Sequence, residues 1–294
     1  MIKNPKENIL VSFSGGETSA YMIYWLLKNK PNYNYKFIYA NTGEENEETL
    51  IFAKQCEDYF SIKLVWVEYK ELSFKIVNYK TAYRSHDKKE TQNKWKNHPF
   101  RKYIEKFMIP NKQNMTCTRE LKEYPITRYL SSIGWTKSKY TTAIGIRNDE
   151  IDRIGKHYYP LAMAGITKPM INNFWDKMPF RLELKGYQGN CKTCWKKSFR
   201  KLGTLYLENP NQFMFMRQME KEYGNFIRET QKHRLKEPMN FFRGNKKVDD
   251  IKEITEQENF KKASDDSIDK NYQISILDEL NQSNGCIESC EVFS

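Results

Sequence analysis

Short apolar runs alternate with segments of helical periodicity over the first seventy residues. Residues 8–13, 35–40 and 62–67 are apolar runs of strand length, and the first of them is followed closely by a pair of glycines. Between them, residues 18–28 and 47–60 place apolar side chains at helical spacing. Strands that alternate with helices in this way need crossover connections, so the pattern predicts a parallel sheet with helices packed on it.

The pattern changes after the third expected strand. Residues 70–115 show little periodicity, and eleven Lys and Arg lie between Lys75 and Lys112 against three acidic residues. This predicts a basic excursion from the sheet that carries short helices. Regular elements resume beyond it, with a helix, a strand and a helix expected at residues 120–130, 140–146 and 168–177.

The C-terminal third is more polar. Residues 200–245 are expected to be helical and basic, and residues 245–275 to form a polar linker, because they hold few apolar side chains to bury. The chain as a whole is predicted to be α/β, with a doubly wound, mostly parallel sheet and a helical C-terminal region. The expected division is residues 1–205 for the α/β domain, including a cysteine loop at 186–198, and residues 206–294 for the helical region and its Cys-bearing tail.

Charge is unevenly distributed along the chain. The net charge is +12, but residues 245–294 hold six Lys and twelve acidic residues, a charge of −6, so residues 1–244 carry +18. A basic body with an acidic tail favours a polyanionic partner, either a nucleotide or a nucleic acid. A lysine-rich composition without any partner would give the same charge.

The expected location is the cytoplasm. No run of about 18 apolar residues is present, so no membrane-spanning helix is expected. The N-terminus lacks the apolar core of a signal peptide. In a reducing compartment the six cysteines are interpreted as metal ligands or redox groups rather than as structural disulfides.

The segment Ser12–Ser19, Ser-Phe-Ser-Gly-Gly-Glu-Thr-Ser, joins the first expected strand to the first expected helix. Its glycines allow a tight turn that brings backbone N–H groups against phosphate oxygens, and the helix N-terminus adds positive potential. The segment has neither the dinucleotide fingerprint nor the Lys of the triphosphate loop. Its position after the first strand of a doubly wound sheet, where ligands bind at the carboxyl ends of strands, predicts a phosphate-binding loop.

This loop resembles the PP-loop of the adenine-nucleotide α-hydrolases, whose pattern is Ser-Gly-Gly-x-Asp-Ser or Ser-Gly-Gly-x-Thr-Ser. Residues 41–45, 117–122, 145–150 and 159–162 then follow in the order seen in the phosphoadenosine phosphosulfate reductase family. The resemblance covers roughly residues 8–205 and is closest to the reductase-like proteins often carried by phages and mobile elements. It implies a Rossmann-like sheet that binds an adenine nucleotide, either ATP with Mg²⁺ or a sulfated adenylate, at the first strand–helix turn.

The resemblance also implies a set of nucleotide-binding residues around that turn. These are Ser12, Ser14, Gly15, Gly16, Glu17, Thr18, Ser19, Asn41, Thr42, Gly43, Arg119, Lys122 and Gly145. Arg147 is expected to be catalytic, because a planar guanidinium matches the oxygens of phosphate or sulfate. Glu17 stands where other members often have Lys or Arg, which either argues against turnover or supplies a ligand for Mg²⁺.

Cys191 and Cys194 form a CxxC motif, which suits a metal ion, a cluster iron or a redox pair. Resemblance to the iron–sulfur members of the family adds Cys117, although those members have two adjacent cysteines there. A [4Fe-4S] cluster is the expected cofactor on that resemblance, with zinc as the alternative and with Cys286 or Cys290 of the tail as the fourth ligand. Cys290 is also a candidate catalytic nucleophile, by analogy with the family reductases, but the tail lacks their Glu-Cys-Gly-Leu/Ile-His motif.

The remaining cysteine and histidines carry weaker signals. Cys56 lies on the apolar face of an expected helix and is interpreted as core. Incidental surface roles are expected for His86, His98, His157 and His233, because none stands at a useful spacing from a carboxylate or cysteine.

Three functions stay open at this point. The first is ATP-dependent adenylylation, with release of AMP and pyrophosphate, coupled to sulfur transfer onto an acceptor such as tRNA or DNA. The second is reduction of a sulfated adenylate to sulfite by a cysteine thiolate. The third is a nucleotide-binding module without turnover. A homodimer is one expectation for the oligomeric state, which the sequence leaves open.

Overall fold

One five-stranded sheet organises the computed structural model, which describes residues 1–85, 95–189, 191–236 and 238–265. The strands are β1 (Asn8–Phe13), β2 (Asn34–Asn41), β3 (Leu64–Lys70), β4 (Ser73–Val77) and β5 (Tyr140–Ala143). Their spatial order is β4-β3-β2-β1-β5, and all are parallel except β4, which runs antiparallel to β3. The predicted mostly parallel α/β sheet is confirmed.

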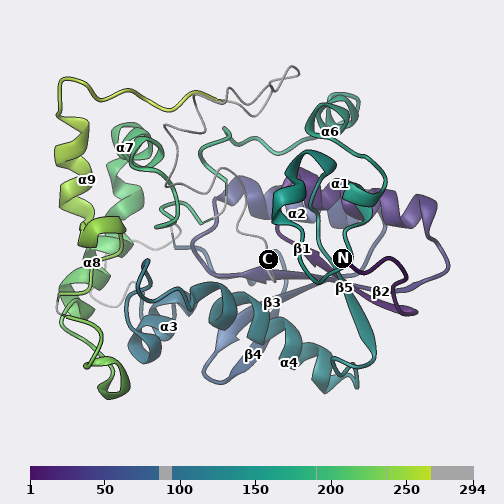
Figure 1. The fold of residues 1–294 in the computed structure, drawn as a ribbon, viewed down its shortest axis with the longest axis horizontal. Coiled ribbons are helices and arrows are strands. Elements are labelled where there is room, and N and C mark those ends of the chain that lie inside the picture. Colours follow the sequence, from purple (N-terminus) through teal and green to yellow (C-terminus); the bar gives the residue numbers. More distant parts are fainter. Residues whose placement is uncertain (86–94, 190, 237, 266–294) are drawn as a thin grey trace.

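Helices cover both faces of the sheet (Figure 1). The helices α1 (Glu17–Asn29), α2 (Glu47–Tyr59) and α6 (Lys168–Trp175) lie on one face, and α4 (Tyr124–Ser132) lies on the other. Because side chains alternate along a strand, Ile9 and Val11 join the core under the first group, whereas Leu10 packs with the residues of α4. Because both faces of the sheet are buried, the strands appear in the sequence as continuous apolar runs.

The winding of the sheet reverses at β1. From this strand, β2 and β3 extend to one side and β5 lies on the other. In open α/β sheets, ligands bind at such a switch point, beyond the carboxyl ends of the strands. The predicted phosphate loop follows β1 directly and therefore lies at this point.

A second apolar core joins the basic excursion to the C-terminal helices. Within it, α3 (Pro99–Phe107) packs against α8 (Met214–Tyr223), and α7 (Phe199–Glu208) packs against α9 (Val248–Thr255). Figure 1 shows α7, α8 and α9 gathered at one end of the molecule. The expected domain boundary at residue 205 falls inside α7, and the division into two domains stays a prediction.

The remaining elements of the described residues are short. They are the π-helical turn η1 (Arg119–Glu123), the single turn α5 (Pro160–Met163) and the 3₁₀ turns η2 (Asn148–Arg153), η3 (Pro210–Phe213), η4 (Glu229–Gln231) and η5 (Arg243–Asn245).

Two elements lie where the sequence predicted none. Strand β4 forms a hairpin with β3 inside the basic excursion. Helix α9 occupies part of the expected polar linker, because Val248 and Ile251 are both fully buried in the second core. Two apolar side chains three residues apart do not stand out in a charged segment, so only their packing against α7 and α8 identifies the helix.

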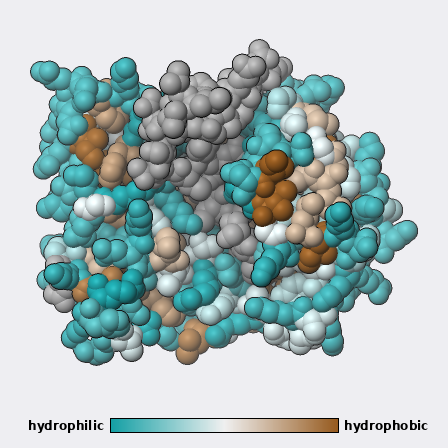
Figure 2. All heavy atoms as spheres, viewed as in Figure 1, coloured by the Kyte–Doolittle hydropathy of each residue, from teal (hydrophilic) through white to brown (hydrophobic). Residues whose placement is uncertain are grey.

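The described residues on one face of the molecule are largely polar. Figure 2 shows a mostly hydrophilic face on which apolar side chains gather only in small, separate areas. No helix of the described residues is both long enough and apolar enough to cross a membrane.

Glu220 on α8 is a buried carboxyl that ties α9 to the second core. It accepts hydrogen bonds from the backbone N–H groups of Phe241 (3.2 Å) and Val248 (3.0 Å), and Val248 begins α9. Burial raises the pKa of Glu220 to about 7, with the two N–H groups opposing the shift and Asp249 and Asp250 adding to it. A carboxyl whose pKa is raised on folding stabilises the fold below its unfolded pKa, and this contribution is lost as the pH rises through about 7.

We therefore expect Glu220→Gln to change the pH dependence of stability. The free energy of unfolding of the wild type, relative to that of the variant, should fall by on the order of 2 kcal/mol between pH 5 and pH 8, because only the wild type ionises a buried group over this range. Urea unfolding at the two pH values measures it. Glu229→Gln is the control, since that carboxylate is 84% exposed. A constant difference between wild type and Glu220→Gln would contradict the assignment.

Candidate nucleotide-binding site

The turn between β1 and α1 has the geometry of an anion-binding loop. Gly15 adopts a φ of +84°, which favours glycine. A Cβ there would lie 2.6 Å from Thr49 Cγ2 and 3.1 Å from the Tyr39 ring, so the turn also passes too close to its neighbours for a side chain. Helix α1 begins at Glu17 after Gly16, and no side chain caps its N-terminus. Backbone N–H groups at this end are thus left for a bound anion.

Hydroxyl groups brace the loop from inside. The hydroxyls of Ser14 and Ser19 are 2.9 Å apart, and Ser19 also donates to the carbonyl of Gly16. The backbone N–H of Ser14 donates to Ser19 Oγ at 3.3 Å. Ser12, in contrast, is fully buried in β1, and its Oγ makes no hydrogen bond to a described residue. Ser12 is therefore inaccessible to a nucleotide in this structure, whereas Ser14 is partly exposed at the turn.

The segment after β5 closes the other side of the loop. A Cβ on Gly145 would lie 3.1 Å from the Cα of Ser19, so the two backbones meet in close contact. Two residues later, the guanidinium of Arg147 donates to Thr18 Oγ1 at 3.2 Å and to Asp149 Oδ1 at 3.1 Å. Arg147 also pairs with Glu150, and its side chain is only 2% exposed. Arg147 thus lies behind the loop and holds Thr18, rather than projecting into solvent beside it.

Glu17 is compensated by a residue far away in the sequence. Arg181 donates to both carboxylate oxygens of Glu17, at 3.0 and 3.1 Å, in a bidentate pair. The indole N–H of Trp175 donates to the Glu17 carbonyl at 3.1 Å, which anchors α6 to the start of α1. The acid at the phosphate loop is therefore neutralised, and both of its oxygens are occupied by Arg181. This does not favour the expectation that Glu17 binds Mg²⁺.

The turn after β2 is a buried hydrogen-bonded unit. Asn41 donates to Glu68 Oε1 at 2.7 Å and accepts from the N–H of Gly43, whose φ is +85°. Glu45 accepts from both the N–H and the hydroxyl of Thr42, at 2.9 and 2.8 Å. Asn41 and Thr42 are almost fully buried. Their side chains fix the shape of the turn, so a nucleotide near it would meet the backbone.

His98 contacts this turn, although a surface or incidental role was expected for it. Its side chain is fully buried, its Nε2 is 2.9 Å from Glu44 Oε1, and its Nδ1 accepts from the N–H of Phe100. Burial lowers the pKa of His98, with Glu44 opposing the shift. A neutral ring with Nε2–H fits these contacts, because Nδ1 is an acceptor. Only the His-Pro pair at the start of α3 hinted at a helix cap here.

Glu44 shares this buried site with a cation from the cysteine loop. Burial raises the pKa of Glu44, but the charge of Lys192 and the hydrogen bond from His98 outweigh it and leave that pKa below its usual value. The backbone N–H of Lys192 also donates to the Glu44 carbonyl at 2.8 Å. The cysteine loop is therefore attached to the strand-two turn through both charge and backbone.

Two of the predicted metal ligands lie in this loop. Cys191 Sγ is 3.6 Å from Thr42 Oγ1, and the N–H of Cys194 donates to the Cys191 carbonyl at 3.2 Å. Burial, with Glu45 adding to it, raises the pKa of the Cys191 thiol well above its usual value. Cys117 is half-buried beside the second core, whereas Cys56 is fully buried, as predicted.

The described residues do not by themselves fit a metal ion or cluster. No group of three or more His, Cys, Asp or Glu side chains is arranged to hold one within the described ranges. Cys286 and Cys290, the tail residues expected to complete the ligand set or to act as nucleophile, lie outside those ranges, as does His86.

The last two predicted nucleotide ligands lie on η1. Arg119 pairs with Glu120 at 2.9 Å and is about half exposed, which suits a surface charge. Lys122 is buried and contributes a positive charge near Cys191. The structure therefore groups Lys122 with the cysteine loop and the strand-two turn.

Comparison with known proteins shows which family the chain belongs to. The phosphoadenosine phosphosulfate reductase domain matches residues 8–157, which include the loop, the strand-two turn and the Gly145–Arg147 segment. The chain belongs to the phosphoadenosine phosphosulfate reductase family. It is also 28% identical over 291 residues to the uncharacterized nin region protein ORF290 of Escherichia phage lambda, covering 97% of this chain and 94% of that protein. No solved structure matches it.

Membership of the phosphoadenosine phosphosulfate reductase family confirms the resemblance read from the PP-loop and the motifs that follow it. The family binds adenine nucleotides of the sulfated type, and its members are enzymes. The relative in phage lambda agrees with the expected likeness to phage-borne proteins. The individual ligand assignments, from Ser12 to Gly145, stay predictions.

We expect Gly15→Ala to destabilise this family member and weaken its binding of nucleotide. The added methyl would occupy a left-handed φ and collide with Thr49, at a cost of about 1–3 kcal/mol. Gly16→Ala is the matched control for stability, because its φ is −101° and an added Cβ would meet only Ser14 Oγ at 3.7 Å. Urea unfolding of both variants measures the difference. Equal stabilities would show that the turn is less constrained than described.

We expect Arg181→Ala to weaken nucleotide binding more than loss of a distant charge would. Removing Arg181 takes away the cation that binds both oxygens of Glu17, and the carboxylate, 9% exposed beside the phosphate loop, then repels an anion. Adding Glu17→Gln should restore part of the lost affinity, because the double variant has no stranded charge. Titration calorimetry with ATP on the two single variants and the double variant gives the coupling. Additive effects of the two substitutions on ATP affinity would contradict the coupling between Glu17 and Arg181.

Proposed function

We propose that this protein is an adenylylating enzyme that uses ATP to activate an acceptor and then directs sulfur onto it. One observation carries the proposal: the loop from Ser14 to Ser19 keeps its full pattern, its left-handed glycine and an α1 N-terminus without a side-chain cap. An anion as large as a di- or triphosphate suits such a loop. An intact loop favours ATP over a sulfated adenylate, because the sulfonucleotide reductases carry a degraded version.

The proposed chemistry needs positioning and charge stabilisation above all. An acceptor oxygen attacks the α-phosphorus, and the bond to the bridging oxygen breaks, so pyrophosphate leaves and an adenylylated acceptor forms. A sulfur nucleophile then displaces AMP. The N–H groups of the loop and the hydroxyl of Ser14 face the charge that develops on pyrophosphate. Mg²⁺ would contribute charge neutralisation along with the nucleotide, and no step is assigned to a metal held by the protein.

Arg147 acts as a positioning residue in this proposal. Its guanidinium holds Thr18 and is itself held by Asp149 and Glu150. A buried, triply engaged guanidinium fixes the first turn of α1 relative to the segment after β5. The role of Arg147 is therefore to keep the loop in the geometry that binds phosphate.

Reduction of a sulfated adenylate to sulfite is the second candidate. Family membership favours it, as does the position of Cys191 beside Thr42 on the strand-two turn. Its nucleophile must be a thiolate, and burial raises the pKa of the Cys191 thiol. By resemblance to the family reductases, Cys290 is the candidate for that role.

Glu17 no longer favours the third candidate, a nucleotide-binding module without turnover. The acid beside the phosphate loop is neutralised by Arg181, so its presence is compatible with an enzyme. The acceptor in our proposal is a nucleic acid, supported by the charge of +18 that residues 1–244 carry. A homodimer and a cytoplasmic location remain part of the proposal.

Product analysis with wild type and Ser14→Ala tests the function. With radiolabelled ATP, total RNA or DNA as acceptor and a sulfide donor, the wild type should release AMP and pyrophosphate. Ser14→Ala should be slower by about 10- to 100-fold, because one donor to the developing charge is lost. Ser138→Ala is the control. This exposed serine is far from the phosphate loop in the sequence, and its hydrogen bonds are with Lys6 and Thr136.

Two other outcomes would decide against the proposal. Release of sulfite from a sulfated adenylate, with no pyrophosphate from ATP, would establish the reductase. Tight binding of ATP without either product, in the presence of acceptor and a sulfide donor, would establish the module.

A further inference from the structure

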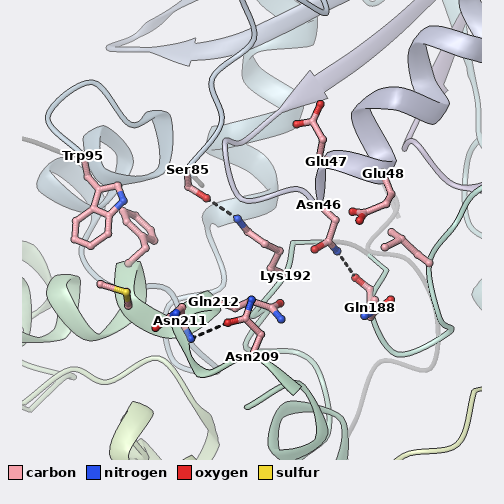
Figure 3. Close-up of a pocket in the computed structure, with 13 residues that line it drawn as sticks. Asn46, Glu47, Glu48, Ser85, Trp95, Gln188, Lys192, Asn209, Asn211 and Gln212 are labelled. Carbon is pink, nitrogen blue, oxygen red and sulfur yellow. Dashed lines mark hydrogen bonds between the residues drawn. The ribbon is translucent and has the colours of Figure 1, made fainter. Parts of the chain in front are cut away.

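A second cavity lies beyond the strand-two turn, outside the phosphate loop. It measures about 710 Å³, which is within the range of small-molecule sites. Its walls come from the start of α2, from the cysteine loop and from the connection between α7 and α8 (Figure 3). Among the described residues, none that was predicted for nucleotide or metal binding lines it. Lys192 is shared with the buried Glu44 site, so the cavity adjoins the strand-two turn.

Carboxamides dominate the polar lining of this cavity. Asn46, Gln188, Asn209, Asn211 and Gln212 all face it (Figure 3). Asn46 donates to the Gln188 carbonyl at 2.9 Å, and Asn209 accepts from the N–H of Asn211 at 3.1 Å. No hydrogen bond within the described residues uses the side-chain amides of Asn211 or Gln212. The cavity thus presents both donors and acceptors that are available to a ligand.

The opposite wall is aromatic. Trp95 and Phe215 line it with ring centroids 5.8 Å apart in an edge-to-face arrangement. Phe215 also stacks on His98 at 4.1 Å, which fixes the ring against the buried Glu44 site. Phe215 is only 3% exposed, so the partly exposed Trp95 supplies the aromatic surface of the cavity. An indole together with a set of amides suits a planar heterocycle with polar edges.

Charge in the cavity argues against a phosphate inside it. Glu47 pairs with Arg84 at 2.7 Å, and Glu48 adds a second carboxylate to the lining. The cation of Lys192 is bonded to Ser85 at 2.6 Å and is balanced by the buried Glu44. The ligand that fits is therefore uncharged, with its hydrogen-bonding groups at the edges of a ring.

We propose that this cavity binds a nucleobase, presented either by a single strand of nucleic acid or by a free nucleoside. Amide side chains hydrogen-bond base edges, and an aromatic wall stacks on the base face. The role of that base as the acceptor rests on the proposed function, but its binding does not. Residues 196–236, which include the cavity wall at α7 and α8, hold ten Lys and Arg against four acidic residues and would meet the phosphates of a strand outside the cavity.

The test uses full-length protein whose phosphate loop is filled with a non-hydrolysable ATP analogue. Fluorescence anisotropy compares labelled single strands of about 12 nucleotides with an abasic strand of the same length. The free nucleosides serve as competitors in a second arm. We expect the base-bearing strand to bind at least about 10-fold more tightly than the abasic one, since stacking of one base is worth about 1–3 kcal/mol.

The variant Asn211→Ala/Gln212→Ala removes the two available amides, of which Asn211 is exposed and Gln212 partly exposed. It should weaken binding of the base-bearing strand about 10-fold and leave the abasic strand, the salt dependence of binding and the affinity for ATP unchanged. Lys221→Ala, on an exposed face of α8, is the control and should preserve the preference for bases. Competition by nucleosides, lost in the double variant, would support the free-nucleoside source.

Equal binding of abasic and base-bearing strands, with no nucleoside competition, would overturn the inference. So would a double variant that binds like the wild type. Failure of ATP turnover with base binding intact would count against the proposed function only, because the two sites are probed separately.

Discussion

The close approach of backbones around the β1–α1 turn is the constraint on which the rest of the site depends. Gly15 packs against Tyr39 and Thr49 on the β2 side, and Gly145 packs against Ser19 on the β5 side. Both contacts leave no room for a side chain, so the loop is held between the two halves of the sheet. The α1 N-terminus, where N–H groups are available to an anion, is positioned by this double contact.

Electrostatic compensation between distant segments makes that arrangement stable. Arg181 neutralises Glu17 at the start of α1, and Lys192 together with His98 holds Glu44 in its buried site. Each buried acid would otherwise carry the cost of an unpaired charge. His98 comes from the basic excursion between β4 and β5, and Arg181 and Lys192 come from the chain after β5. The basic excursion and the cysteine loop are therefore part of the site.

The two candidate binding places are adjacent and differ in chemistry. The phosphate loop offers backbone N–H groups and a helix N-terminus, whereas the cavity beyond the strand-two turn offers amides, an aromatic wall and carboxylates. The first suits an anion and the second an uncharged ring. Lys192, whose backbone bonds to Glu44 and whose side chain lines the cavity, connects the cavity to the strand-two turn. An enzyme that activates one substrate with a nucleotide needs such neighbouring sites of different polarity.

The sequence alone determined the sheet, the phosphate loop and the family, because these depend on local periodicity and on residues close together in the chain. Strand β1, the glycines after it and the burial of Cys56 follow from such short-range patterns. The pairing of Glu17 with Arg181, the burial of His98 and the existence of α9 depended on tertiary structure, since their partners lie far away in the sequence. A charge at position 17 or a histidine before a proline looks the same whether it is exposed or compensated. Only the packing of distant segments decides whether such a side chain is exposed or buried, and a buried charge requires a partner.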